Sequence, residues 1–263
     1  MITKVFWLLV LVVSVPGNVF AAERLDFSVR GRTLALSVYR PASAPRGTVV
    51  MGSGDVGWVG LGPAIAEDLS SRGYIVVGVN IRQYLSVFTD GKQHLSVQDV
   101  GSDYYELRAV LVREQLLVKP VIVSGVSEGA AVAILAAADR RNHQWIDGVI
   151  TMGLPPTAEL AWRWTDVASW ITKHDADEPS FAPNEFIAAV APLPLFMLQS
   201  TKDEYVTEAD YRRFEATAKP PRKLVLIDAS NHRFTDKRRE LHAAYIDGLD
   251  WIRGLARTGD ATR

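Results

Sequence analysis

The chain contains no cysteine among its 263 residues. Disulfide bonds, thiolate nucleophiles and cysteine-ligated metal ions are therefore excluded, and the fold must be held by burial alone. Neither sign of charge is in surplus, because 29 Lys and Arg face 30 Asp and Glu. This balance gives no overall attraction to nucleic acid or to an anionic membrane. There is also no internal repeat and no low-complexity linker, so we expect a single globular domain.

Long apolar runs are absent as well, except at the start of the chain. Lys4 precedes the uninterrupted apolar run Val5–Val13, which Pro16 and Gly17 break before Ala21. This pattern predicts a signal peptide over residues 1–21 and a periplasmic or secreted protein. An uncleaved membrane anchor is the alternative, although the run is short for crossing a bilayer. Residues 22–263 are then long enough for one large domain with a sizeable core.

Most of this domain alternates strand-like apolar runs with helix-like periodicity. Residues 25–39 predict a β-hairpin that turns at Gly31, and residues 82–96 predict a polar loop. The expected strands are 48–51, 74–81, 121–126, 146–152, 195–198 and 224–227, and the expected helices are 61–72, 97–117, 130–138, 208–218 and 238–255. Such alternation predicts a mostly parallel central sheet with helices on both faces. The active site of such a sheet lies at the carboxyl ends of its strands.

Residues 155–192 interrupt this alternation. The segment contains Trp162, Trp164 and Trp170, and it falls where a small helical cap would be inserted above the sheet. The three tryptophans either face an acyl chain or the bilayer, or pack on the core as in any cap. The sequence leaves both readings open.

The sequence Gly125-Val-Ser-Glu-Gly129 follows an apolar strand and precedes an alanine-rich helix. In a G-x-S-x-G turn the glycines relieve crowding against the neighbouring strand and helix, and the serine hydroxyl is left accessible. Strand, tight turn and helix are the context that this motif requires. We therefore predict that Ser127 is a nucleophile, although the pattern alone also fits a plain strand–helix connection.

A serine nucleophile needs a base, and the base needs an acid that orients it. Of five histidines, His232 follows the last expected strand, and only His94 is otherwise placed near that edge of the sheet. Asp203 follows the preceding strand, so the order Ser127, Asp203, His232 is the one expected of an α/β-hydrolase. Asp203 otherwise reads as a turn or helix-cap residue. Glu204 and Asp228 are the alternative acids.

The oxyanion formed in acyl transfer needs two N–H donors. Glu128 N–H follows the nucleophile, and we predict Asp55 N–H, in the glycine-rich loop after residue 51, as the second. That loop lacks the lysine and the spacing of a phosphate-binding loop. The Glu128 carboxylate either complements a helix N-terminus or recognises a cationic group, and the Asp55 carboxylate is equally open. We take Gly54, Trp58 and Trp164 as the candidate substrate-binding residues.

The G-x-S-x-G turn around Ser127, called the elbow below, and the order of the three triad residues resemble those of the α/β-hydrolase superfamily. Ser53-Gly-Asp-Val-Gly-Trp58, with the elbow behind it, more narrowly resembles the bacterial VirJ-type (VirJ/AcvB-like) virulence protein family over residues 46–140. Relatives in that family are implicated in hydrolysing aminoacylated phosphatidylglycerol, which this resemblance implies as a substrate. Glu128 departs from the bulky apolar residue that usually follows the serine there, and Asn80–Tyr84 matches the family's Arg-Tyr segment only loosely.

We therefore expect an exported serine hydrolase that cleaves a carboxylic ester, with peripheral membrane contact if the ester is a lipid. Ser127, His232 and Asp203 would act without metal or cofactor, and nucleic acid is not expected as a partner. A small-ester or dienelactone-type hydrolase is the rival enzyme. A non-catalytic secretion or virulence accessory protein on a hydrolase scaffold is the rival outside enzymes, because fold does not fix function.

Overall fold

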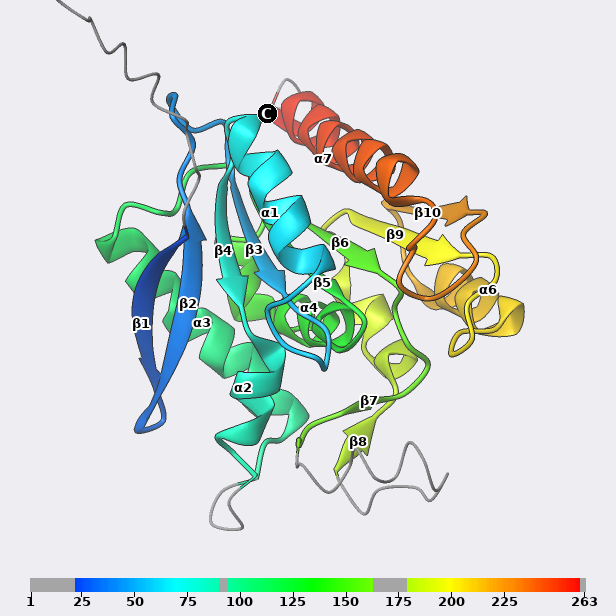
Figure 1. Ribbon diagram of the computed structural model, residues 1–263, viewed down its shortest axis with the longest axis horizontal. Coiled ribbons are helices and arrows are strands. Elements are labelled where there is room, and N and C mark those ends of the chain that lie inside the picture. Colours follow the sequence, from blue (N-terminus) through cyan, green and yellow to red (C-terminus); the bar gives the residue numbers. More distant parts are fainter. Residues whose placement is uncertain (1–21, 90–93, 163–178, 261–263) are drawn as a thin grey trace, which may run out of the picture.

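The computed structural model describes residues 22–89, 94–162 and 179–260. Its centre is an eight-stranded sheet with the strand order β1-β2-β4-β3-β5-β6-β9-β10 (Figure 1). The strands are β1 (Glu23–Val29), β2 (Arg32–Tyr39), β3 (Thr48–Gly52), β4 (Ile75–Val79), β5 (Val121–Val126), β6 (Gly148–Met152), β9 (Leu195–Ser200) and β10 (Arg222–Ile227). Every strand agrees with an expected one to within a few residues.

The sheet is parallel from β4 to β10, whereas β2 pairs antiparallel with both β1 and β4. The predicted hairpin is confirmed, and it turns through Arg30 and Gly31, which both have positive φ. Because the six strands from β4 to β10 run the same way, their carboxyl ends meet at one edge. The loops after Gly52, Val126, Met152, Ser200 and Ile227 all emerge there.

Two apolar clusters cover the two faces of the sheet. The main helices are α1 (Leu61–Ser71), α3 (Val97–Arg113), α4 (Glu128–Ala138), α6 (Glu208–Thr217) and α7 (Arg238–Asp260). Residues of α1 and α7 pack on one face, and residues of α3, α4 and α6 pack on the other (Figure 1). Along β3, Val50 belongs to one cluster, whereas Val49 and Met51 belong to the other, which is the alternation a doubly covered strand requires. The predicted α/β-hydrolase fold class, a mostly parallel sheet with helices on both faces, is confirmed.

The expectation of a polar loop over residues 82–96 is wrong at its start. A short helix, α2 (Ile81–Ser86), follows β4 directly, and the Asn80 side chain caps it by accepting a hydrogen bond from Gln83 N–H. Its buried side chains Tyr84 and Leu85 explain why a polar sequence folds here. The Tyr84 hydroxyl donates a hydrogen bond of 2.6 Å to Asp103 of α3, which fixes α2 to the domain. Helix α3 itself ends at Arg113, earlier than the predicted residue 117.

The expected insertion, residues 155–192, is described only in part. Its described residues form a small antiparallel pair, β7 (Ala158–Glu159) with β8 (Ser180–Phe181), and two 3₁₀ turns, η2 (Pro183–Glu185) and η3 (Ile187–Val190). A third such turn, η1 (Arg140–Gln144), follows α4. Strands β7 and β8 lie beyond the carboxyl ends of β3 to β6, on the same side as α2 (Figure 1). Among the described residues, no helix is long and apolar enough to cross a membrane.

Candidate active site

Ser127 occupies the strained turn that the G-x-S-x-G pattern predicts. Its backbone has φ 51° and ψ −118°, a region that residues with a Cβ rarely adopt. Neighbouring backbone atoms leave no room for a side chain at either flanking glycine. A Cβ at Gly125 would lie 2.0 Å from the Gly129 carbonyl oxygen, and one at Gly129 would lie 2.4 Å from the Ser53 carbonyl oxygen. The turn is therefore held by close backbone packing on both sides.

Hydrogen bonds fix the orientation of this turn. Ser127 N–H donates to the Met152 carbonyl at 2.9 Å, which ties the elbow to the end of β6. The Ser127 carbonyl accepts from Ala130 N–H at 2.8 Å and so begins α4. Ser127 thus stands at the carboxyl edge of the sheet, between β5 and a helix whose residues 129–137 are all buried.

Asp203 follows the end of β9, and His232 follows the end of β10. His232 Nδ1 lies 2.6 Å from Asp203 Oδ2, and the Asp203 side chain has no exposed surface. The other Asp203 oxygen, Oδ1, accepts hydrogen bonds from Tyr205 N–H at 2.9 Å and Val206 N–H at 3.0 Å. The carboxylate is therefore held rigidly, and it directs the Nδ1 proton of His232 toward itself, leaving Nε2 as an acceptor.

The two alternative acids have other positions. Glu204 Oε2 accepts a hydrogen bond of 2.7 Å from the main-chain N–H of His232, so it holds the histidine loop instead of the imidazole ring. Asp228 is exposed and pairs with Lys202 and Thr201. His94, the other histidine considered, is exposed in the segment before α3. The sequence did not suggest the role of Glu204, because a contact to a backbone N–H leaves no pattern.

The His232 ring packs against Gly153, which follows β6. A Cβ at Gly153 would lie 2.8 Å from His232 Cε1, and Gly153 directly follows Met152, the residue that binds Ser127 N–H. The ring also meets Tyr205 edge to face, with centroids 5.3 Å apart. The imidazole is thus packed against both Gly153 and Tyr205. Gly153 is a site residue that sequence reasoning missed, since a lone glycine after a strand carries no signal.

The loop after β3 lies against the same serine. A Cβ at Gly54 would lie 3.7 Å from Ser127 Cβ. The loop is held by Ser53, whose hydroxyl donates to the Gly54 carbonyl at 2.9 Å and accepts from Ile81 N–H at 3.0 Å. Within the described part of the chain, neither Asp55 N–H nor Glu128 N–H donates a hydrogen bond to a protein group. Both predicted oxyanion donors are therefore available for a ligand.

Glu128, the residue after Ser127, carries a buried carboxyl group. Its Oε2 is buried and has no hydrogen-bond partner, while the carboxyl group accepts a hydrogen bond from Glu159 N–H. Burial, and then the neighbouring Asp55 and Glu159 carboxylates, raise the pKa of Glu128 to about 8. A carboxylate that only complements a helix N-terminus would be solvated. The burial of the Glu128 carboxyl and its unpartnered oxygen therefore indicate a further role.

Two of the three predicted substrate-binding residues are described. Gly54 lies against Ser127, as above. The Trp58 indole packs against Gly78 of β4, and its Nε1–H donates to the Tyr39 hydroxyl at 3.1 Å. These contacts anchor the ring, which also lines a pocket. Trp164 lies outside the described residues. Among those residues, no group of three or more His, Asp or Glu side chains could hold a metal ion.

Comparison with known proteins identifies the family and the fold. The sequence matches the family model described as "Bacterial virulence protein (VirJ)" over residues 47–249. A search of curated proteins finds no match. Similar solved structures include Est1E from Butyrivibrio proteoclasticus, with a TM-score of 0.62, 14% identity and coverage of 88% of this chain and 99% of that one.

Two further structures are similar over comparable lengths. A putative dienelactone hydrolase from Klebsiella pneumoniae has a TM-score of 0.65 and 12% identity, covering 88% of this chain and 98% of that one. An α/β serine hydrolase without a lid from Xanthomonas campestris has a TM-score of 0.56 and 20% identity, covering 88% and 94%. At these identities the likeness shows the α/β-hydrolase fold.

Proposed function

We propose that this chain, which belongs to the family of bacterial virulence proteins described as VirJ, is a serine hydrolase that cleaves carboxylic esters. One observation carries the proposal. The strained Ser127 turn and the hydrogen-bonded pair of His232 Nδ1 and Asp203 Oδ2 stand together at the carboxyl edge of one sheet. A structural role explains neither the strain at Ser127 nor the burial of a carboxylate on an imidazole.

The reaction would follow from these positions. Ser127 Oγ attacks the ester carbonyl carbon while His232 Nε2 takes the hydroxyl proton. The oxyanion binds to the N–H groups of Asp55 and Glu128, and the alcohol leaves with the proton from His232. Water then attacks the acyl-serine with His232 as base, which releases the carboxylic acid and restores Ser127. Asp203 holds His232 in the required tautomer throughout.

Reaction with a fluorophosphonate probe tests this proposal. The folded protein should be labelled at Ser127, and labelling should be lost in Ser127→Ala and strongly slowed in His232→Gln. Ser71→Ala, an exposed change on α1, is the matched serine control and should be labelled like the wild type. If the wild-type protein is folded but resists the probe, the non-catalytic accessory role on a hydrolase scaffold becomes the better account.

The acyl group that we propose is an aminoacyl group, as in aminoacyl-phosphatidylglycerol. Support comes from Glu128, the residue after the nucleophile, whose Oε2 is buried and unpartnered and whose carboxyl group interacts with the Asp55 and Glu159 carboxylates. An ammonium group on the substrate would satisfy this oxygen and relieve the repulsion among the three carboxyls. Glu128→Gln should therefore lower kcat/KM for an alanyl ester more than for the matched propionyl ester.

A lipid assay in cells separates this substrate from soluble esters. Loss of Ser127 should raise aminoacyl-phosphatidylglycerol in the membrane, whereas complementation with the wild-type gene should restore it. Unchanged lipid levels, together with a preference for short water-soluble nitrophenyl esters, would favour the small-ester or dienelactone-type alternative.

Export and membrane contact belong to the same proposal. Residues 1–21 lie outside the described residues, so the signal peptide stays a prediction, which is tested by fractionation and by sequencing the mature N-terminus. Exposed apolar side chains near the site, Val56, Val59 and Tyr205, are suited to peripheral contact with a bilayer.

A further inference from the structure

The Ser53 hydroxyl is bonded to the peptide group that carries a proposed oxyanion donor. Ser53 Oγ donates a hydrogen bond of 2.9 Å to the Gly54 carbonyl. That carbonyl and the Asp55 N–H belong to one peptide group, which is planar and trans. In such a group the C=O and N–H bonds point in opposite directions. A bond that fixes the Gly54 carbonyl therefore also fixes the direction of Asp55 N–H.

A second donor acts on the same carbonyl. Gly57 N–H donates to the Gly54 oxygen at 3.1 Å and closes a turn that has Asp55 and Val56 at its centre. Both donors lie on the carbonyl side of the peptide group, whereas Asp55 N–H has no protein acceptor in the described part of the chain. The two hydrogen bonds thus leave Asp55 N–H turned away from them and available to a ligand.

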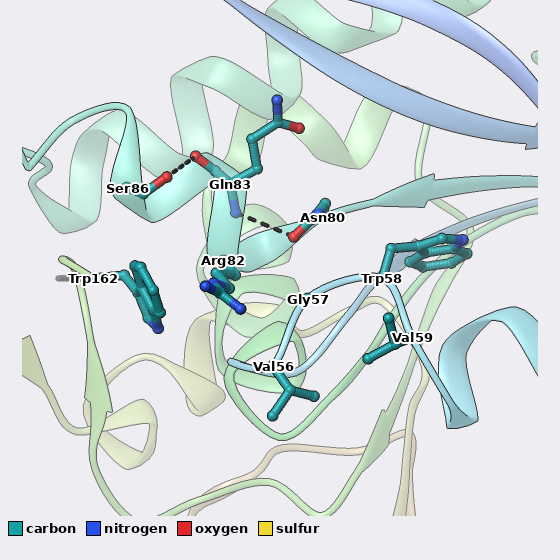
Figure 2. A pocket seen from close by; sticks show the side chains of 9 residues that line it. All are labelled: Val56, Gly57, Trp58, Val59, Asn80, Arg82, Gln83, Ser86 and Trp162. Carbon is teal, nitrogen blue, oxygen red and sulfur yellow. Dashed lines mark hydrogen bonds between the residues drawn. The ribbon is translucent and has the colours of Figure 1, made fainter. Parts of the chain in front are cut away.

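The start of α2 supports both of these donors. Ile81 N–H donates to Ser53 Oγ at 3.0 Å, so the hydroxyl accepts there and directs its single proton to Gly54. Asn80, the cap of α2, stands next to the loop (Figure 2), and a Cβ at Gly57 would lie 3.2 Å from Asn80 Oδ1. The loop is therefore held from α2 at the two residues that bind the Gly54 carbonyl.

The main chain of Ser53 is fixed on its other sides. Its N–H donates to the Val79 carbonyl at 3.0 Å, at the end of β4. Its own carbonyl packs on the elbow, where a Cβ at Gly129 would lie 2.4 Å from the oxygen. Ser53 is only 1% exposed, and the next residue lies against Ser127. The hydroxyl is thus the link between this rigid frame and the peptide group that follows Gly54.

We propose that Ser53 is a positioning residue that preforms the oxyanion hole, by fixing the direction of Asp55 N–H before substrate binds. The inference rests on the proposed function, because an oxyanion forms only if Ser127 is acylated. Donors that are already in place need no reorganisation in the transition state, and this gives them their large effect. Loss of the Ser53 hydroxyl should therefore slow the chemical step without weakening the binding of substrate.

The kinetic test compares kcat with KM for nitrophenyl butyrate. Ser53→Ala should lower kcat by about tenfold to a hundredfold, less than a missing donor costs, because the Gly57 bond remains. KM should change by less than about twofold, since the lost interaction acts in the transition state. Ser53→Cys keeps a weak S–H donor, so its kcat should fall between. An unchanged kcat, or a rise in KM alone, overturns the inference.

Thr48→Val is the matched control on the same strand. Thr48 is buried at the opposite end of β3, and its hydroxyl also joins a carbonyl to an N–H. It donates to the Leu116 carbonyl at 2.6 Å and accepts from Val118 N–H at 2.9 Å. Removing it should lower the unfolding temperature and leave kcat unchanged. If Thr48→Val and Ser53→Ala lose kcat equally, the Ser53 hydroxyl serves only the fold and the inference is wrong.

A measurement without catalysis separates this inference from the proposed function. The residual dipolar coupling of the Asp55 N–H reports its direction in isotope-labelled Ser127→Ala protein. This coupling should change in the Ser127→Ala, Ser53→Ala double variant, while the couplings of the α4 amides stay the same. If it changes but the wild type resists the fluorophosphonate probe, the positioning role stands and the proposed function fails. If it does not change, the inference fails even when the wild type hydrolyses esters.

Discussion

Gly153 lies directly against the imidazole of His232. A Cβ at this position would meet His232 Cε1 at 2.8 Å and Nδ1 at 3.2 Å, and Gly153 also has a positive φ of 59°. The end of β6 therefore serves as the surface on which the histidine rests. A side chain at position 153 would displace the ring from the place where Nδ1 meets Asp203.

We predict that Gly153→Ala lowers kcat by about a hundredfold, because a displacement near 1 Å of a catalytic group costs about that much. Gly31→Ala is the matched control, since Gly31 also has a positive φ of 74° but nothing within 4 Å of its Cβ position. The control should lose about 1 kcal/mol of stability from backbone strain and keep its kcat. Equal kcat in both variants would show that His232 does not rest on Gly153.

Substitutions of the two acids next to His232, Asp203 and Glu204, should have very different effects on kcat. Asp203→Asn should lower kcat by about 10³- to 10⁴-fold, because an amide no longer favours the tautomer with its proton on Nδ1. Glu204→Gln keeps an oxygen that accepts from His232 N–H, so its kcat should fall by no more than about threefold. The measurement is kcat on a nitrophenyl ester. A large loss in Glu204→Gln with little in Asp203→Asn would exchange the two roles.

The elbow should store strain that a stability measurement reveals. The free energy of unfolding of Ser127→Gly should exceed that of Ser127→Ala by about 1 kcal/mol. A residue with a Cβ in this region is strained by about 1–3 kcal/mol, and the greater freedom of glycine in the unfolded chain offsets part of that. Urea unfolding of these two inactive variants isolates the backbone term, since both lack the hydroxyl. Equal stabilities would mean that the turn at φ 51° is not strained.

The Trp58 anchor gives a prediction for the loop that carries Asp55. A Cβ at Gly78 would lie 2.2 Å from Trp58 Cζ2, so Gly78→Ala should displace the ring and cost about 1–3 kcal/mol of stability. A Cβ at Gly62 would lie 3.3 Å from the same ring. Gly62→Ala should therefore change the stability little, because the better helix propensity of alanine in α1 offsets the close contact. Thermal unfolding and indole fluorescence measure both effects. A neutral Gly78→Ala would show that the loop adjusts freely.

The parts of the site that the sequence predicts are those with local signals. The elbow lies within five residues, and the strand ends that carry Asp203 and His232 follow from β/α alternation. What it missed depends on tertiary contacts. Helix α2 is only six residues long and folds because Tyr84 and Leu85 are buried. The stack of Arg82 on Trp162 joins residues far apart in sequence, which no spacing rule brings together.

The pH dependence of stability should report the burial of Glu128. Its folded pKa is about 8 and its ordinary value 4.5, so between these values the folded protein holds a proton that the unfolded chain releases. Its contribution is fully present below pH 4.5 and is lost as the pH rises through 8. Wild-type stability should therefore decline relative to Glu128→Gln by up to about 1.4 kcal/mol per pH unit in this window.

Urea unfolding of both proteins from pH 5 to pH 8.5 measures this difference, and Glu67→Gln, an exposed change on α1, is the control that should parallel the wild type. Parallel curves for wild type and Glu128→Gln would mean that the carboxyl is solvated, and the case for an ammonium partner would be lost with it. A bound cation gives the opposite trend, because it favours the ionised carboxylate. An alanyl ester analogue bound to Ser127→Ala protein should accordingly reduce the decline, and the propionyl analogue should not.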